Sequence, residues 1–220
     1  MKRQATRIAM TAAMLLSIAH VADAHVSFVA NNAYAGKSYV ATANIPHGCE
    51  DSSLAKYDTI KIEITIPAGF TAVRPADAAF GPATIEKDGS GNVTKLIWTK
   101  AAAALTDDTH LYQVTFRGTL PNTPLQSLDF VTKQTCSGNT TKTWEGVDAP
   151  KLPVLPARAP GWNKYTAQEN IDEATIKAFF ADAYIVWSNG AAYSANAVTA
   201  GLITNKLTAI PLGAQFWVKY

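Results

Sequence analysis

The sequence lacks long apolar runs, and it contains only two cysteines. After residue 24, no stretch approaches the roughly 20 consecutive apolar residues that a membrane-spanning helix requires, so we expect no membrane span. Cys49 and Cys136 stand far apart and do not have the C-x-x-C spacing of a loop that binds soft metals. The sequence therefore predicts a protein that does not cross a membrane.

The chain also lacks an excess of either charge, with 19 lysines and arginines against 17 aspartates and glutamates. Three of these basic residues and one acidic residue lie within positions 1–24, so removal of that segment would leave 16 of each sign. A chain of near-zero net charge has no need of nucleic acid or anionic lipid as a partner. We expect neither.

Enzyme motifs are missing as well. The nucleophile elbow Gly-x-Ser-x-Gly does not occur. The glycines at 89 and 91 mark a hairpin tip with no helix after it, so they do not form a phosphate-binding loop. Adjacent acidic residues such as Glu50-Asp51 diverge on a strand, which disfavours a catalytic dyad. We therefore expect a protein that is not an enzyme.

What the sequence does contain begins with a Sec-type signal peptide over residues 1–24. A basic start is followed by an apolar run over 8–19 and by Ala22-Asp23-Ala24, the small-x-small pattern that signal peptidase cuts after. We expect cleavage after Ala24 and a periplasmic or otherwise exported product. His25 would be its first residue.

An amino-terminal histidine is a chelating residue, because its free α-amine and its ring Nδ1 can bind the same ion. The α-amine has a reference pKa of about 7.7–8.0, so a metal can displace its proton near neutral pH. Two or three nitrogens in a plane suit Cu(II) best among the common divalent ions. The alternative is that cleavage simply happens to leave His25 at the terminus.

From His25 to about Leu152 the pattern is that of short β-strands separated by Gly/Pro turns. Alternation with period two is cleanest over 59–66, where four isoleucines would face a core. A hairpin signal lies at 88–92. The expected strands cover 38–45, 59–66, 83–87, 93–98, 110–118 and 128–134. This spacing predicts a mainly β fold, an antiparallel β-sandwich of immunoglobulin-like type over 25–148.

The composition then changes. Residues 149–160 carry four prolines and predict an extended linker. Beyond it, 171–180 is helical in pattern with Asn170 as N-cap, and two segments are strand-like, 184–187 and 214–220. We expect residues 161–220 to form a small α+β appendage docked on the sandwich. Its aromatic residues could line a groove or bury the appendage's own small core: Trp162, Trp187, Tyr193 and Trp217.

The two cysteines allow two interpretations. An exported protein meets an oxidising compartment, which favours a disulfide between Cys49 and Cys136. The alternative is a pair of thiolate ligands for Cu(I).

Four short segments complete the pattern, in this order: His25-Val26-Ser27, Ile45-Pro46-His47-Gly48-Cys49-Glu50, Gln134-Thr135-Cys136 and Thr143-Trp144-Glu145. Their combination with the signal-peptide junction resembles the YcnI-like copper-binding family of exported bacterial proteins, over roughly residues 25–160. The resemblance implies an immunoglobulin- or fibronectin-like β-sandwich. It also implies a Cu(II) site formed by the amine and imidazole of the first mature residue, with a glutamate as a further ligand and a tryptophan close by.

Two residues carry over directly from this resemblance. His25 matches the first mature residue of the family. Trp144 follows Gln134-Thr135-Cys136 at the family's distance and matches the tryptophan beside the metal, where an indole can exclude water and limit redox cycling. Packing in the sandwich core is the alternative role for Trp144.

The glutamate does not carry over. In the family it stands two residues after the proline that matches Pro46, and here that position is Gly48. His47 and Glu50 are the nearest substitutes and Glu145 is a more distant one. The alternative is that His47 and Glu50 are simply residues of a solvated turn.

Together these observations predict an exported protein that binds Cu(II) for carriage, buffering or homeostasis, with copper and other copper-handling proteins as its partners. One alternative is a copper-dependent oxidase resembling lytic polysaccharide mono-oxygenases, in which His47 or His110 would complete a histidine brace. Another is a structural or adhesive sandwich without metal.

Overall fold

A computed structural model describes residues 25–29, 31–50, 53, 55–100 and 110–220 of the chain. The predicted signal peptide, residues 1–24, lies outside these described residues. Within the described ranges, no helix has the length and apolar character needed to span a membrane.

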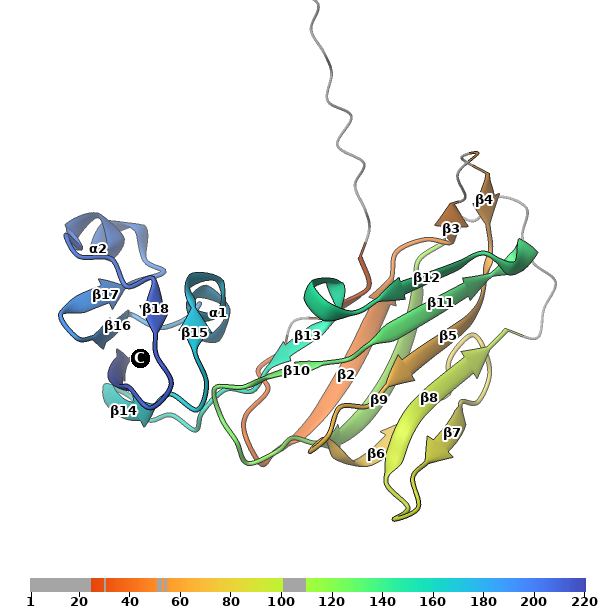
Figure 1. Ribbon diagram of the computed structural model, residues 1–220, viewed down its shortest axis with the longest axis horizontal. Coiled ribbons are helices and arrows are strands. Elements are labelled where there is room, and N and C mark those ends of the chain that lie inside the picture. The colour runs from red at the N-terminus through yellow and green to blue at the C-terminus, as the bar shows by residue number, and fades with distance from the viewer. Residues whose placement is uncertain (1–24, 30, 51–52, 54, 101–109) are drawn as a thin grey trace, which may run out of the picture.

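The first and larger part of the described chain is an antiparallel β-sandwich (Figure 1). One sheet has the strand order β1-β2-β9-β6 and the other has the order β12-β11-β5-β8-β7, while β3 pairs with β4 and β10 with β13. The strands are β1 (Ser27–Phe28), β2 (Ser38–Ile45), β3 (Cys49–Glu50), β4 (Lys56–Tyr57), β5 (Thr59–Thr65), β6 (Thr71–Pro75), β7 (Thr84–Lys87), β8 (Val93–Thr99), β9 (Tyr112–Thr119), β10 (Ser127–Asp129), β11 (Thr132–Cys136), β12 (Thr141–Trp144) and β13 (Lys151–Pro153). Two 3-10 turns flank β12, η1 (Ser137–Asn139) and η2 (Gly146–Asp148). The predicted mainly β sandwich is confirmed.

The strands that the sequence predicts well are those in which buried and exposed side chains alternate. In β2, alternate residues are buried along the whole strand, and its bounds are those predicted. In β5, Ile62 and Ile64 are fully buried between the sheets, while Ile60 is only partly covered. β9 begins two residues later than predicted, because His110 and Leu111 are exposed and precede the strand.

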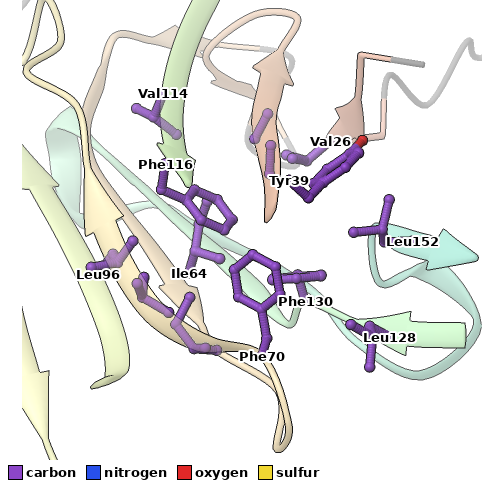
Figure 2. Close-up of a cluster of buried hydrophobic side chains, with 14 of the residues drawn as sticks. Val26, Tyr39, Ile64, Phe70, Leu96, Val114, Phe116, Leu128, Phe130 and Leu152 are labelled. Carbon is purple, nitrogen blue, oxygen red and sulfur yellow. The ribbon is translucent and has the colours of Figure 1, made fainter. Parts of the chain in front are cut away.

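Aromatic side chains fill the space between the two sheets (Figure 2). Phe130 lies at the centre, with its ring centroid 5.5 Å from that of Phe70 and 5.7 Å from that of Phe116. Phe70 also packs against the backbone of β9 at Gly118, where an added Cβ would lie 2.3 Å from the Phe70 ring. Only glycine fits at position 118 of β9, because the Phe70 ring occupies the space that a side chain would need.

The segment predicted as one strand over 128–134 is two strands that belong to different sheets. β10 pairs with β13, with Leu128 opposite Leu152, whereas β11 pairs with β5. Phe130 lies between β10 and β11 and is fully buried. The chain therefore changes sheets at a core residue, which an apolar–polar pattern cannot reveal.

The Pro-rich stretch 149–160 is extended, and its first half is part of the sandwich. It contains β13, and Leu152 and Val154 are buried in the sandwich core. The Val154 N–H donates to the Gln126 carbonyl oxygen at 2.8 Å. Proline has no backbone N–H to donate to a neighbouring strand. It is tolerated in β13 because this strand has a neighbour, β10, on one edge only.

Residues after the Pro-rich stretch form a small α+β unit with its own core, as predicted. Its main sheet has the order β14-β19-β16-β17, and β15 pairs with β18. The elements are β14 (Trp162–Thr166), β15 (Ile171–Asp172), α1 (Glu173–Phe179), β16 (Ile185–Ser188), β17 (Ala191–Tyr193), α2 (Ala197–Leu202), β18 (Ala209–Ile210) and β19 (Gln215–Lys219).

The helix α1 begins later than predicted, and its N-cap is Asp172. The Asp172 carboxylate accepts the Thr175 N–H at 2.8 Å. Its pKa is lowered by hydrogen bonds from Thr175, first from the side chain and then from the N–H. Asn170, the predicted N-cap, instead accepts the Leu212 N–H at 2.9 Å. That prediction was wrong because Ile171 and Asp172 pair with β18 before the helix starts.

Two features dock this unit on the sandwich. Leu125, from the loop before β10, is 1% exposed and belongs to the apolar core of the C-terminal unit. Arg158 pairs with Asp182, and its guanidinium lies over the rings of Tyr34 in the sandwich and Tyr220 at the end of the chain. The unit is therefore held by a shared core residue and by a cation between two aromatic rings.

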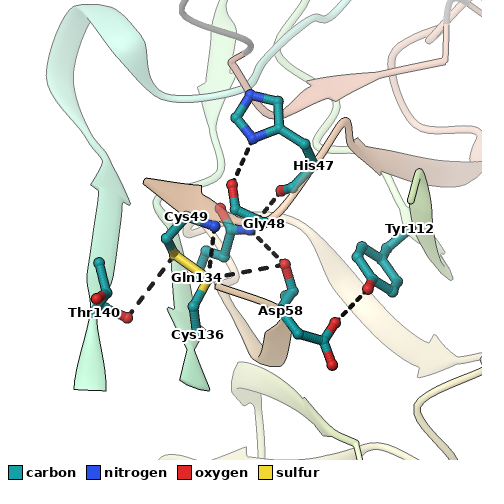
Figure 3. Close-up of a disulfide and its surroundings, with 9 residues drawn as sticks. His47, Gly48, Cys49, Asp58, Tyr112, Gln134, Cys136 and Thr140 are labelled. Carbon is teal, nitrogen blue, oxygen red and sulfur yellow. Dashed lines mark hydrogen bonds between the residues drawn. A yellow bond between two sulfur atoms is a disulfide. The ribbon is translucent and has the colours of Figure 1, made fainter. Parts of the chain in front are cut away.

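Cys49 and Cys136 form a disulfide, which confirms the predicted pairing (Figure 3). The bond joins β3 to the end of β11 across a sequence separation of 87 residues, with the Cα atoms 5.9 Å apart. Neither cysteine is free. These thiols are therefore not available as Cu(I) ligands while the bond is intact.

We predict that the disulfide supplies a large part of the stability of the sandwich. By the chain-entropy model, a bridge closing a loop of this length stabilises the folded state by about 4–5 kcal/mol. The double variant Cys49→Ala/Cys136→Ala should lose that amount in urea unfolding. Thiol titration of the unfolded, unreduced protein should find essentially no thiol. Two free thiols, or equal stability of the double variant, would contradict the prediction.

Candidate metal centre

His25 lies two residues before the short strand β1, at one edge of the sandwich. The next residue, Val26, is 2% exposed and packs in the sandwich core. β1 then pairs with β2, with Ser27 opposite Asn44. Because Val26 and Ser27 are both anchored, the backbone of His25 has a defined place although its side chain is 42% exposed.

The imidazole of His25 faces a carboxylate from the other sheet. Its Nε2 lies 3.3 Å from Oδ1 of Asp148, at the end of the turn η2 that follows β12. Figure 1 shows this turn beside the point where β1 begins. The pair is exposed, so it contributes little to stability. Its effect is orientation: when the Nε2–H donates to Asp148, the lone pair of the neutral ring is on Nδ1.

Trp144 is a core residue at the end of β12, four positions before Asp148. It is 4% exposed and lies opposite Thr132 in the sheet. Trp144 therefore packs in the sandwich core, the alternative role that the sequence allowed. Its indole Nε1 is buried and has no hydrogen-bond partner among the described residues, an uncommon state for a buried donor.

The turn that carries His47 is hydrogen-bonded to Gln134 of β11 (Figure 3). The side-chain amide of Gln134 donates to the His47 carbonyl oxygen at 2.8 Å and to Thr59 Oγ1 at 2.6 Å. The His47 ring is exposed, and its Nδ1–H donates to the carbonyl oxygen of Gly48. Gln134 and the disulfide at Cys49 thus fix the backbone of the turn.

Glu50 is exposed at the end of β3, where its backbone lies opposite that of Lys56 in β4. Within the part of the chain that the structure describes, no three side chains of His, Cys, Asp or Glu gather closely enough to hold a metal ion. His25, His47 and Glu50 therefore do not form a ligand cluster of side chains.

Asp148 is the residue that the sequence did not reveal. It lies 123 positions from His25, and its segment reads as an ordinary turn after a strand. The contact arises because the edge strands β1 and β12 belong to opposite sheets, so it depends on how the sheets pack. No local pattern encodes that arrangement.

Comparison with known proteins gives a family and a fold. A family model described as "Domain of unknown function (DUF1775)" matches residues 25–163, and YcnI-like proteins belong to this family. An uncharacterized protein from Nocardia farcinica, whose crystal structure "reveals an immunoglobulin-like fold", is 18% identical with a TM-score of 0.50. The match covers 59% of this chain and 97% of that chain. Among curated proteins, none matches.

We predict that Asp148 orders the imidazole of His25 in solution. In the metal-free chain beginning at His25, ¹³C relaxation of the ring should give an order parameter near that of rigid groups, and Asp148→Ala should lower it towards that of flexible ones. Asp129→Ala, which removes an exposed aspartate paired with Lys151, is the matched control and should leave the ring unchanged. Equal mobility in all three proteins would show that the contact is not populated.

Proposed function

The chain belongs to the DUF1775 family, and on that basis we propose that it is an exported copper-binding protein that holds Cu(II) through His25. Its role is the carriage, buffering or homeostasis of copper in the periplasm or an equivalent compartment, in exchange with other copper-handling proteins. Copper is the cargo of the site.

The observation that carries this proposal is the contact between His25 Nε2 and Asp148 Oδ1 at 3.3 Å. Histidines that bind metals commonly donate their other ring N–H to a carboxylate, which fixes the ring and raises the basicity of the ligating nitrogen. With Nε2 directed at Asp148, the nitrogen for the metal is Nδ1. This is also the nitrogen that closes a chelate ring with the α-amine of the same residue.

The donor chemistry fits Cu(II). An α-amine and an imidazole on one residue supply two adjacent nitrogen ligands, the set that favours Cu(II) over the other common divalent ions. Such a chelate needs no cluster of three side chains, in keeping with their absence from the described residues. The α-amine requires cleavage after Ala24, and the family match beginning at residue 25 supports that junction.

Two further features favour holding copper over using it as a catalyst. The side chain of His25 is 42% exposed at a sheet edge, where a partner protein can reach it. Trp144 is buried four positions before Asp148, and in the family that the chain resembles a tryptophan lies close to the copper, where an indole can exclude water and limit redox cycling.

We predict that Cu(II) affinity depends on both the amine and the imidazole of His25. His25→Ala in the mature chain should abolish high-affinity binding, and one extra residue before His25 should remove most of it. Asp148→Ala should weaken binding by roughly tenfold, the size of effect known for residues that orient a metal ligand. Competition titration with a chromogenic Cu(II) chelator measures all of these.

The matched control is again Asp129→Ala, which should bind like the wild type. Equal affinity of the extended and mature chains would remove the amino-terminal chelate from the account. A mature protein that leaves all copper in the dialysate would instead support a metal-free sandwich. Oxygen-dependent peroxide production by the copper-loaded protein would support the oxidase.

A separate prediction concerns the further donor, since Gly48 has no side chain to offer. His47 and Glu50 stand on a turn fixed by Cys49, so either would lose little entropy on binding. We expect Glu50→Ala or His47→Ala, but not both, to weaken Cu(II) measurably while the His25 pair stays bound. If both single variants and the double variant bind like the wild type, then Glu145 or solvent completes the site.

A further inference from the structure

The C-terminal unit presents tryptophan side chains on the outer face of its main sheet. Side chains of a strand alternate between the two faces, and in β19 Phe216 and Val218 are buried while Trp217 points outward. Trp217 lies opposite Trp187 of β16, and their ring centroids are 5.2 Å apart. Trp162 of β14 is on the same face and is 57% exposed. These rings do not fill the core of the unit.

A pocket of about 620 Å³ adjoins the Trp187–Trp217 pair. Besides the two indoles, its lining includes an amide at Asn189, an amide at Gln215 and the ammonium of Lys206. Asn189 and Gly190 have positive φ angles and form the two-residue turn between β16 and β17, the geometry of a tight hairpin. Of the polar groups, Asn189 stands on this hairpin turn, and Gln215 stands at the start of the neighbouring strand β19.

Lysines accompany the tryptophans on this face. Lys164 lies opposite Trp217, with its Nζ 5.4 Å from the ring centroid. Lys219 lies opposite Trp162 in the same sheet. Lys206 lines the pocket, and no aspartate or glutamate does. Glu173 of α1 lines a second pocket, which Lys206 also lines.

We propose that this face binds an anionic polysaccharide. Exposed indoles on a rigid sheet stack on flat ligand surfaces, and the apolar faces of pyranose rings offer such surfaces. The amides of Asn189 and Gln215 match sugar hydroxyls, which both donate and accept hydrogen bonds. Lys206 and Lys164 match carboxylate or sulfate groups. A single-stranded nucleic acid would also meet stacking rings and cations, but the paired amide rim favours the hydroxyl-rich polymer.

This surface is separate from His25 and does not depend on copper. The full chain should therefore be tested without metal, by affinity electrophoresis and isothermal titration calorimetry. The probes are polygalacturonate (carboxylate), heparin (sulfate), dextran (neutral) and a thymidine oligonucleotide. We expect binding to at least one of the two anionic polysaccharides, weakened by salt because the charged contacts are exposed.

Trp187→Ala and Trp217→Ala should each weaken that binding by roughly tenfold, the order of one stacked-ring contact. Trp187→Phe, which keeps a ring, should lose less, and Lys206→Ala should make the affinity less dependent on salt. The control is Val198→Ala on α2, which removes a 77% exposed side chain away from this pocket and should change nothing. Far-UV and near-UV circular dichroism identify any variant that fails to fold.

Failure to bind either anionic polysaccharide would overturn the proposal. So would equal binding of dextran, tighter binding of the oligonucleotide, or an affinity that the folded Trp187→Phe and Lys206→Ala variants leave unchanged.

Discussion

The candidate metal centre depends on the burial of Val26 and on the pairing of the two-residue strand β1 with β2. Full burial of a valine side chain contributes roughly 1.5–3 kcal/mol, enough to hold a strand of only two residues in its register. Without this anchor, the position of His25 against the sandwich would not be fixed. With it, the first residue of the family match lies at a fixed edge, where the opposite sheet presents Asp148. The contact is thus a consequence of sandwich packing, since its two halves come from different sheets.

The same edge is stiffened from a second direction. Asp58 is fully buried and accepts hydrogen bonds from Lys100 Nζ at 2.7 Å and from the Tyr112 hydroxyl at 2.5 Å. A buried charge paired in this way adds little net stability, but removal of one partner costs several kcal/mol. Asp58 immediately precedes Thr59, which meets Gln134 beneath the His47 turn. The network and the disulfide therefore fix one side of the His47 turn while β1 fixes His25.

The fold was predictable wherever a strand has one face in the core. The strands over 38–45 and 59–66 alternate because β2 and β5 each lie between core and surface, and the Asp88 turn is a local signal. Prediction failed where the partner is distant in sequence. The Pro-rich stretch contains β13, which forms only because it pairs with β10. The helix N-cap is Asp172 and not Asn170, because Ile171 and Asp172 pair with β18 before the helix begins. The turn at Asn189-Gly190 was different, since this dipeptide is a strong hairpin signal and could have revealed β17.

The residues of the candidate site also fall into those that the sequence predicts and those that depend on distant contacts. His25 follows from the signal-peptide junction, and the cysteine pair follows from the predicted export. Asp148 could not be inferred, because it meets His25 only through the relative placement of two sheets. The tryptophans of the C-terminal unit could be seen in the sequence, but their outward direction requires the register of β16 and β19.

The central claim is that the mature chain begins at His25 and that this residue holds one copper ion. Native mass spectrometry of the exported protein, purified after exposure to Cu(II), tests both parts in one spectrum. We expect the mass of a chain that begins at His25, with an intact disulfide and one bound copper ion, and we expect the copper to be lost in the His25→Ala variant. A chain that begins at another residue, or one that begins at His25 and carries no copper, would contradict it.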